Sequence, residues 1–93
     1  MKLALAGAGA FGRKHLDAIA LIDGAEVVSV IDRPGGSQEA VANDYGIAHW
    51  SDDLADALAL DTVDAVILAT PTQMHASQAI AGMEAGKHVL VEI

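Results

Sequence analysis

The sequence contains no cysteine and few aromatic residues, and both absences narrow the class of protein. Without cysteine, a disulfide-stapled fold and a zinc site built from thiolates are excluded. The absence also suits the reducing cytoplasm, which is the location we expect. Aromatic residues make up 3% of the chain, whereas 53% is hydrophobic, mostly alanine, valine, leucine and isoleucine. This composition favours helices packed closely on a sheet over an aromatic binding surface.

Basic residues are scarce as well, since five lysines and arginines stand against 13 acidic residues and give a formal net charge of −8. Nucleic-acid binding needs basic side chains that neutralise phosphates, and anionic membranes repel an acidic surface. No segment approaches the roughly 20 apolar residues that span a bilayer. The histidines lack the spacing of metal ligands. We therefore expect no nucleic-acid partner, no membrane partner and no metal.

Short apolar runs alternate with helical patterns along a chain of 93 residues, which has room for one domain. The predicted strands are 2–6, 25–31, 48–50, 65–69 and 88–92, and the predicted helices are 11–22, 38–45, a short one after Ser51, and 73–85. Ser37, Ser51 and Thr72 are predicted to cap the later helices. Such alternation predicts an α/β fold with a doubly wound parallel sheet of about five strands between two helical layers.

A glycine-rich loop, Gly7-Ala8-Gly9-Ala10-Phe11-Gly12, lies between the first predicted strand and the first predicted helix and matches G-x-G-x-x-G. In this motif the first glycine permits a tight turn, the second lets a pyrophosphate approach the backbone, and the third lets the helix pack on the strand. Free N–H groups at the helix start then bind the phosphates. The residues that we expect to contact a dinucleotide here are Gly7, Gly9, Ala10, Phe11 and Gly12.

An acidic residue, Asp32, ends the second predicted strand about 20 residues beyond the loop, where a dinucleotide site needs an acceptor for the ribose hydroxyls. Its carboxylate would repel a 2′-phosphate, so NAD is favoured. Arg33 could reach a 2′-phosphate or lie over the adenine, which leaves NADP open. Taken singly, the glycines could form a plain turn and Asp32 a solvated strand end. Strand, loop, helix and acid together indicate a Rossmann-type nucleotide site.

Two later segments, Ala69-Thr-Pro-Thr-Gln-Met-His75 and Ala85-Gly-Lys-His-Val-Leu-Val-Glu92, are more specific than the glycine loop. With that loop, they resemble the glucose–fructose oxidoreductase, inositol dehydrogenase and rhizopine catabolism (Gfo/Idh/MocA) family over the whole chain. The resemblance implies an amino-terminal Rossmann domain, a carboxyl-terminal α/β domain, and hydride transfer between NAD or NADP and a sugar, inositol or related polyol.

The resemblance also assigns roles to individual residues. Ala69, Thr70, Pro71 and Thr72 match the loop beside the cofactor, His75 the histidine at the next helix start, and Glu92 the glutamate of an E-K-P motif. His75 has an alternative role, which is to hold the loop backbone. The lysine of E-K-P would fall at position 93, where Ile93 stands. Isoleucine cannot move a proton, so we expect no catalytic residue and cofactor binding without catalysis.

Residues 1–93 are therefore expected to form an NAD(P)-binding domain that is truncated before a sixth strand and lacks the substrate domain. The last predicted strand, 88–92, would be an exposed apolar edge, which predicts a homo-oligomer through that edge or the adjacent face. Two other interpretations remain open: a stand-alone NAD(H)-binding or sensing module, and a structural remnant without a ligand. The intact glycines and Asp32 argue against the remnant.

Overall fold

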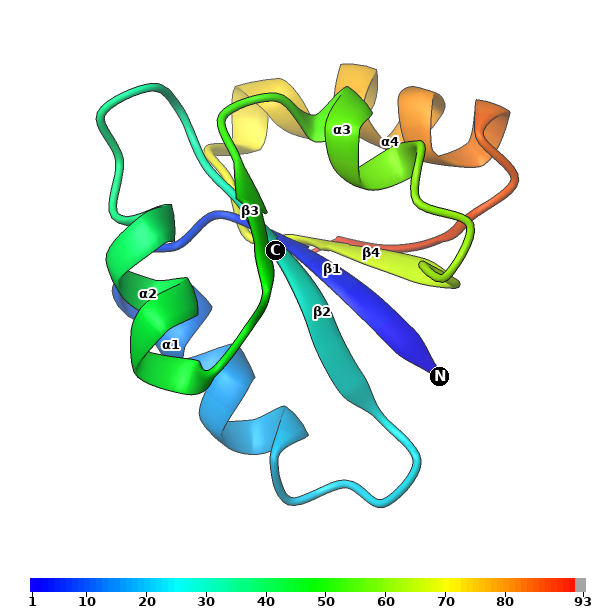
Figure 1. Ribbon diagram of the computed structural model, residues 1–93. Coiled ribbons are helices and arrows are strands. Elements are labelled where there is room, and N and C mark those ends of the chain that lie inside the picture. Colours follow the sequence, from blue (N-terminus) through cyan, green and yellow to red (C-terminus); the bar gives the residue numbers. More distant parts are fainter. Residues whose placement is uncertain (92–93) are drawn as a thin grey trace.

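The computed structural model describes residues 1–91 and shows one parallel sheet (Figure 1). Its strands are β1 (Lys2–Ala6), β2 (Glu26–Ile31), β3 (His49–Ser51), β4 (Ala65–Leu68) and β5 (His88–Val91). They lie in the order β3-β2-β1-β4-β5, and every neighbouring pair is parallel. The expectations for Glu92 and Ile93 lie outside the described residues.

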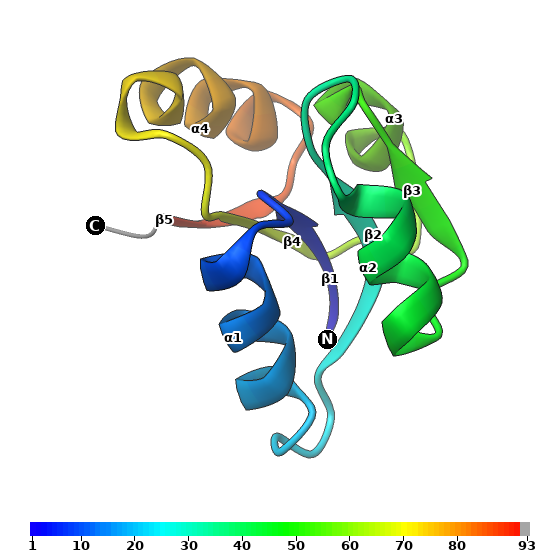
Figure 2. The same ribbon diagram turned by 90° about the vertical axis from the view of Figure 1, so that its left-hand side faces the viewer.

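Helices cover both faces of this sheet. The helices are α1 (Ala10–Ile19), α2 (Gln38–Tyr45), α3 (Leu54–Leu58) and α4 (His75–Glu84), and a 3₁₀ turn, η1 (Thr72–Met74), precedes α4. Figure 2 shows α1 and α2 on one side of the sheet and α3 and α4 on the other. The predicted three-layer α/β/α architecture is therefore confirmed.

The central strands bury both of their faces, because successive side chains point to opposite sides of a strand. In β1, Leu3 and Leu5 belong to the core cluster beneath α1 and α2, and Ala4 and Ala6 belong to the cluster beneath α3 and α4. β4 divides in the same way. This explains why the central strands read as continuous apolar runs in the sequence.

Several predicted helix boundaries and caps were wrong. α1 ends at Ile19 rather than at residue 22, and Leu21 is 86% exposed in the following turn. Ser37 is the N-cap residue of α2, as predicted, but its hydroxyl makes no cap bond and donates to the carbonyl of Ala8 at 3.0 Å. Asp53 rather than Ser51 caps α3 by accepting from the N–H of Ala55 at 3.0 Å.

Thr72 does not cap α4 either, since it opens the 3₁₀ turn that precedes this helix. The hydroxyl of Ser37 bonds to a distant loop and that of Ser51 to Asp53 and Asp56, and sequence patterns do not separate these choices from capping. The predicted glycine end of α2 is confirmed: Gly46 has φ 68°, the left-handed conformation that often follows a helix.

The last strand lies at an edge of the sheet, as expected. Within the described range, β5 pairs only with β4. Its Leu90 and Val91 are 56% and 40% exposed. Self-association through this edge stays a prediction. No helix among residues 1–91 is long and apolar enough to cross a lipid bilayer.

Candidate dinucleotide-binding site

The candidate site lies where the strand order reverses. Within the sheet, β2 and β3 lie to one side of β1, and β4 and β5 lie to its other side. The loops that follow β1 and β4 therefore leave the same edge of the sheet in opposite directions. Parallel α/β sheets bind their ligands at such a switch point, beyond the carboxyl ends of the strands.

The glycines of the loop after β1 serve different geometric needs. Gly7 has φ 105°, and a Cβ added to it would lie 2.5 Å from the carbonyl oxygen of Ala69. A Cβ on Gly12 would collide with the carbonyl oxygen of Gly7, so α1 packs directly on the loop. A Cβ on Gly9 would have no heavy atom within 4 Å. Gly9 therefore leaves open space beside the backbone where a phosphate can approach.

The amino terminus of α1 offers hydrogen-bond donors to that space. The N-cap residue is Gly9, which has no side chain that could bond to the N–H groups of the first turn. Arg13 is the residue whose N–H donates back to Gly9, at 3.1 Å. The N–H groups of Ala10, Phe11 and Gly12 precede the first intrahelical bond, so they can bind an anion together with the positive end of the helix dipole.

Asp32 joins the end of β2 to the glycine loop. One carboxylate oxygen accepts from the N–H of Ala8 at 3.0 Å, and the other accepts from the N–H of Arg33 at 2.8 Å. These bonds fix the half-buried carboxylate beside the loop, and each oxygen keeps a lone pair for a further donor. Such a carboxylate is suited to accept from vicinal hydroxyl groups of a ribose.

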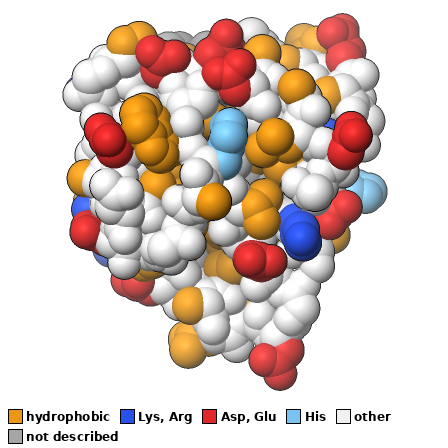
Figure 3. Space-filling view, viewed as in Figure 1, with side chains coloured by type: hydrophobic (Ala, Val, Ile, Leu, Met, Phe, Trp, Pro, Cys, Tyr) orange, Lys and Arg blue, Asp and Glu red, His pale blue; other side chains and the backbone are white. Residues whose placement is uncertain are grey.

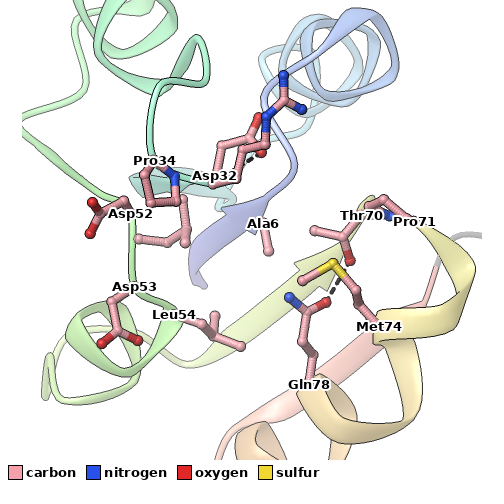
Figure 4. Close-up of a pocket in the computed structure, with 12 residues that line it drawn as sticks. Ala6, Asp32, Pro34, Asp52, Asp53, Leu54, Thr70, Pro71, Met74 and Gln78 are labelled. Atoms are coloured by element: carbon pink, nitrogen blue, oxygen red, sulfur yellow. Dashed lines mark hydrogen bonds between the residues drawn. The ribbon is translucent and has the colours of Figure 1, made fainter.

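Beside Asp32, a cavity of about 380 Å³ opens between the strand ends and α3 and α4 (Figure 4). Its walls combine apolar side chains with a few polar groups, as in most small-molecule sites. Its lining residues are Ala6, Ile31, Asp32, Arg33, Pro34, Asp52, Asp53, Leu54, Thr70, Pro71, Met74 and Gln78.

His75, the first residue of α4, holds the loop after β4 through a hydrogen bond to its backbone. This histidine is 9% exposed, and its Nε2 lies 2.7 Å from the carbonyl oxygen of Thr70. The bond to the loop backbone, which was the alternative role for His75, is therefore present. The hydroxyl of Thr70 donates to Oε1 of Gln78 on α4. Both contacts fix the conformation of the loop at the cavity wall.

The structure brings four of the expected residues together and separates others. Asp32, Arg33, Thr70 and Pro71 line the one cavity. Phe11 is 65% exposed and lies outside that lining, with the ammonium of Lys14 5.5 Å from its ring centroid. The remaining expected residues within the described chain lie in the adjoining loops or in the first turns of the helices that follow, without lining the cavity: Gly7, Gly9, Ala10, Gly12, Ala69, Thr72 and His75.

Sequence reasoning missed the residues that complete the cavity. Asp52, Asp53 and Leu54 follow β3 directly, so a rule that flags residues after every parallel strand would have found them. Gln38 gave no such signal: it is buried in α2, and its amide nitrogen donates to the carbonyl of Arg33 at 3.0 Å. Gln38 thereby holds the loop that carries Asp32.

The charges around the site are mostly negative. Acidic side chains are spread over the face seen in Figure 3, where basic side chains are few. The cavity lining contains three carboxylates, those of Asp32, Asp52 and Asp53, and one guanidinium, that of Arg33. Among residues 1–91, no cluster of His, Cys, Asp or Glu could hold a metal ion.

The sequence of this chain matches a known oxidoreductase family. Its sequence model, Gfo/Idh/MocA, is described as "Oxidoreductase family, NAD-binding Rossmann fold" and matches residues 1–93. The chain belongs to this family. The glycine loop, the switch point and Asp32 all lie within the residues that this Gfo/Idh/MocA model matches.

Relatives with known activities share the whole of this domain. The chain is 63% identical to 4-carboxy-2-hydroxymuconate-6-semialdehyde dehydrogenase of Sphingobium sp. SYK-6, over 100% of the chain and 30% of that protein. It is 37% identical to scyllo-inositol 2-dehydrogenase (NAD(+)) of Bacillus subtilis, over 99% of the chain and 27% of that protein. The chain thus spans less than a third of the length of these Gfo/Idh/MocA relatives.

A solved structure agrees with the fold. The WlbA dehydrogenase from Bordetella pertussis, in complex with NADH and UDP-GlcNAcA, superposes with a TM-score of 0.88. The match has 36% sequence identity and covers 98% of this chain and 28% of WlbA. This chain therefore has the same fold as the corresponding part of WlbA.

Proposed function

We propose that this domain binds NAD(H) with the pyrophosphate at the amino terminus of α1 and the adenosine in the cavity beside Asp32. The observation that carries this proposal is the Asp32 carboxylate, fixed 3.0 Å from the N–H of Ala8 between the open glycine loop and the cavity. A ribose placed there meets an oriented acceptor, and its phosphates meet the helix N–H groups.

The charge balance supports NAD over NADP. A 2′-phosphate on the adenosine ribose would approach the carboxylate of Asp32, and Asp52 and Asp53 add negative charge at the same cavity. Arg33, which is exposed, is the cation that lines this cavity within residues 1–91. We propose that NAD is preferred and that Arg33 permits weaker binding of NADP.

For the protein as a whole, we propose hydride transfer between the nicotinamide and an organic substrate. The bound dinucleotide supplies the hydride chemistry, and the residues described here bind and orient it. The chain spans about 30% of its 63% identical relative, so the remaining length of such a protein is available for substrate contacts. We propose that residues 1–93 alone bind dinucleotide without turnover.

Two substrate classes are candidates. The family resemblance and the scyllo-inositol 2-dehydrogenase relative support a sugar, inositol or related polyol. The 63% identical relative is named for a carboxylated semialdehyde, and this higher identity favours that second class. Parallel assays of the intact protein with a polyol panel and with carboxylated semialdehydes separate the two classes, because NADH formation follows directly in both.

A calorimetric titration of the 93-residue chain with NADH and NADPH in parallel tests the cofactor proposal. We expect NADH to bind more tightly than NADPH. Circular dichroism must first show that the chain is folded. A folded chain that gives no heat with either dinucleotide would overturn the proposal and favour the structural remnant. If the intact protein binds dinucleotide but turns over no substrate of either class, a stand-alone sensing module would be favoured.

A further inference from the structure

Gln78 presents a hydrogen-bond donor to the cavity from the first half of α4. Its Oε1 accepts from the hydroxyl of Thr70, and in this arrangement the amide nitrogen is the atom left to bind another partner. In Figure 4 the amide nitrogen is turned away from Thr70, toward the middle of the cavity between Ala6 and Leu54. In the part of the chain that the structure describes, Nε2 of Gln78 has no hydrogen-bond partner.

The surroundings of this nitrogen decide what it can bind. Ile31, Leu54 and Met74 supply apolar surface to the same cavity, and Asp52 and Asp53 supply carboxylates, which accept but do not donate when ionised. A half-buried donor next to apolar walls is stabilised by a ligand acceptor, because leaving it unpaired after water is displaced is costly. A purine offers a flat apolar face together with ring nitrogens that accept.

We propose that Gln78 is a specificity-determining residue, which donates from Nε2 to a ring nitrogen of the adenine, and that Thr70 positions its amide. The inference rests on the proposed binding of the adenosine half in this cavity. It assigns Thr70 a task besides its place in the cofactor loop, since its hydroxyl holds the amide of Gln78 in the orientation in which Oε1 faces the loop and Nε2 faces the cavity.

Substitution at Gln78 in the intact protein tests the donor. Gln78→Glu keeps an acceptor and loses the donor, and Gln78→Met keeps the size without hydrogen bonding. We expect both to weaken binding of ADP-ribose and NADH by about fivefold to tenfold, as loss of one hydrogen bond does, and to leave the affinity for nicotinamide mononucleotide unchanged. The matched control is Gln73→Glu, on the exposed turn before α4, which we expect to change affinity by less than about twofold.

Thr70 tests the orientation of the amide. Thr70→Val removes the hydroxyl, and we expect a loss of ADP-ribose affinity similar to that of Gln78→Met. Thr70→Ser keeps the hydroxyl and should restore most of the affinity. If Thr70→Val binds ADP-ribose as well as Thr70→Ser does, the hydroxyl does not position Gln78 and the proposal is wrong on this point.

Adenosine monophosphate analogues in which one ring nitrogen is replaced by C–H identify the bond itself. The unsubstituted protein should bind one of the 1-deaza, 3-deaza and 7-deaza analogues less tightly than AMP, and Gln78→Met should abolish that difference. Equal penalties in both proteins would overturn the role of Gln78. An unsubstituted protein that binds neither NADH nor AMP would instead contradict the proposed function.

Discussion

The carboxylate of Asp32 and the N–H of Ala8 are 3.0 Å apart, so the end of β2 and the glycine loop are joined before any ligand is present. The hydroxyl of Ser37 adds a second bond, to the carbonyl of Ala8. A loop that is already ordered loses less entropy when it binds phosphates. Asp32 therefore has two tasks, which are to shape the loop and to accept from the ribose.

Asp32→Ala should weaken NADH binding by about tenfold or more, which corresponds to roughly 1.4 kcal/mol, because hydrogen bonds to a charged group are lost. NADPH should lose less, since the repulsion of its 2′-phosphate disappears with the carboxylate. Parallel calorimetric titrations measure both effects. Asp23→Ala, on the exposed turn before β2, is the matched control. An unchanged ratio of the two affinities would contradict the ribose role of Asp32.

Gly9→Ala should separate folding from binding. The added Cβ meets no heavy atom within 4 Å, so the melting temperature should stay within a few degrees of that of the unsubstituted chain. The methyl group occupies the space expected for the pyrophosphate, and NADH affinity should fall by about tenfold or more. Thermal unfolding measures the melting temperature and calorimetry measures the NADH affinity, both on one preparation. Undiminished affinity would show that the phosphates lie elsewhere.

Gly7→Ala should instead reduce the stability of the fold. Its Cβ would lie 2.5 Å from the carbonyl oxygen of Ala69, across the junction of β1 and β4, and its φ is 105°. We expect a loss of roughly 3 kcal/mol or more in the free energy of unfolding. Gly24→Ala is the control, because Gly24 has φ 84° with open space around it and should cost only about 1–2 kcal/mol. Equal losses would show that the close approach to Ala69 carries no cost.

The sequence predicted the layers and the glycine loop correctly because each depends on local patterns. Buried strands such as β1 and β4 are continuous apolar runs, and a motif of glycines at fixed spacing needs no long-range information. Position at the carboxyl end of a strand also sufficed to select Asp32 as a candidate, and the structure places it in the cavity wall.

Contacts between distant segments were beyond the sequence. Ser37 lies where a capping residue stands, but Ala8, 29 residues away, provides its hydrogen-bond partner. Gln78 lies in an ordinary helical stretch, and only the approach of α4 to the loop after β4 places it at the cavity. Such contacts depend on how the elements pack, which no local pattern records.

Leu90→Lys should reduce self-association if the β5 edge pairs with a second copy. Leu90 is exposed on the edge strand, and a charged side chain there disfavours pairing between strands of two molecules. Size-exclusion chromatography with light scattering measures the mass of both proteins at tens of micromolar. Phe11→Lys, which adds the same charge at an exposed apolar residue on α1, is the control. A monomeric unsubstituted chain would refute the predicted oligomer.

Tyr45 provides a test of the α1–α2 surface that is independent of any ligand. Its hydroxyl donates to the carboxylate of Asp17 at 2.9 Å, and this bond raises the pKa of Tyr45 above its usual value, because the protonated phenol is the donor. The nearby guanidinium of Arg13 acts in the opposite direction and lowers the same pKa. The two neighbours therefore predict shifts of opposite sign.

Asp17→Asn should lower the pKa of Tyr45 toward its usual value, and Arg13→Gln should raise it further. Tyr45 is the sole tyrosine of the chain, so the ultraviolet absorbance of the phenolate follows this one group. Because the pKa is raised in the folded state, the stabilising contribution is fully present below the usual tyrosine pKa near 10 and is lost as pH rises through the folded value. Unfolding measured across that alkaline range should therefore show a smaller pH dependence for Asp17→Asn than for the exposed control Asp61→Asn. Identical titration curves for the two variants would show that Tyr45 and Asp17 are not hydrogen-bonded in solution.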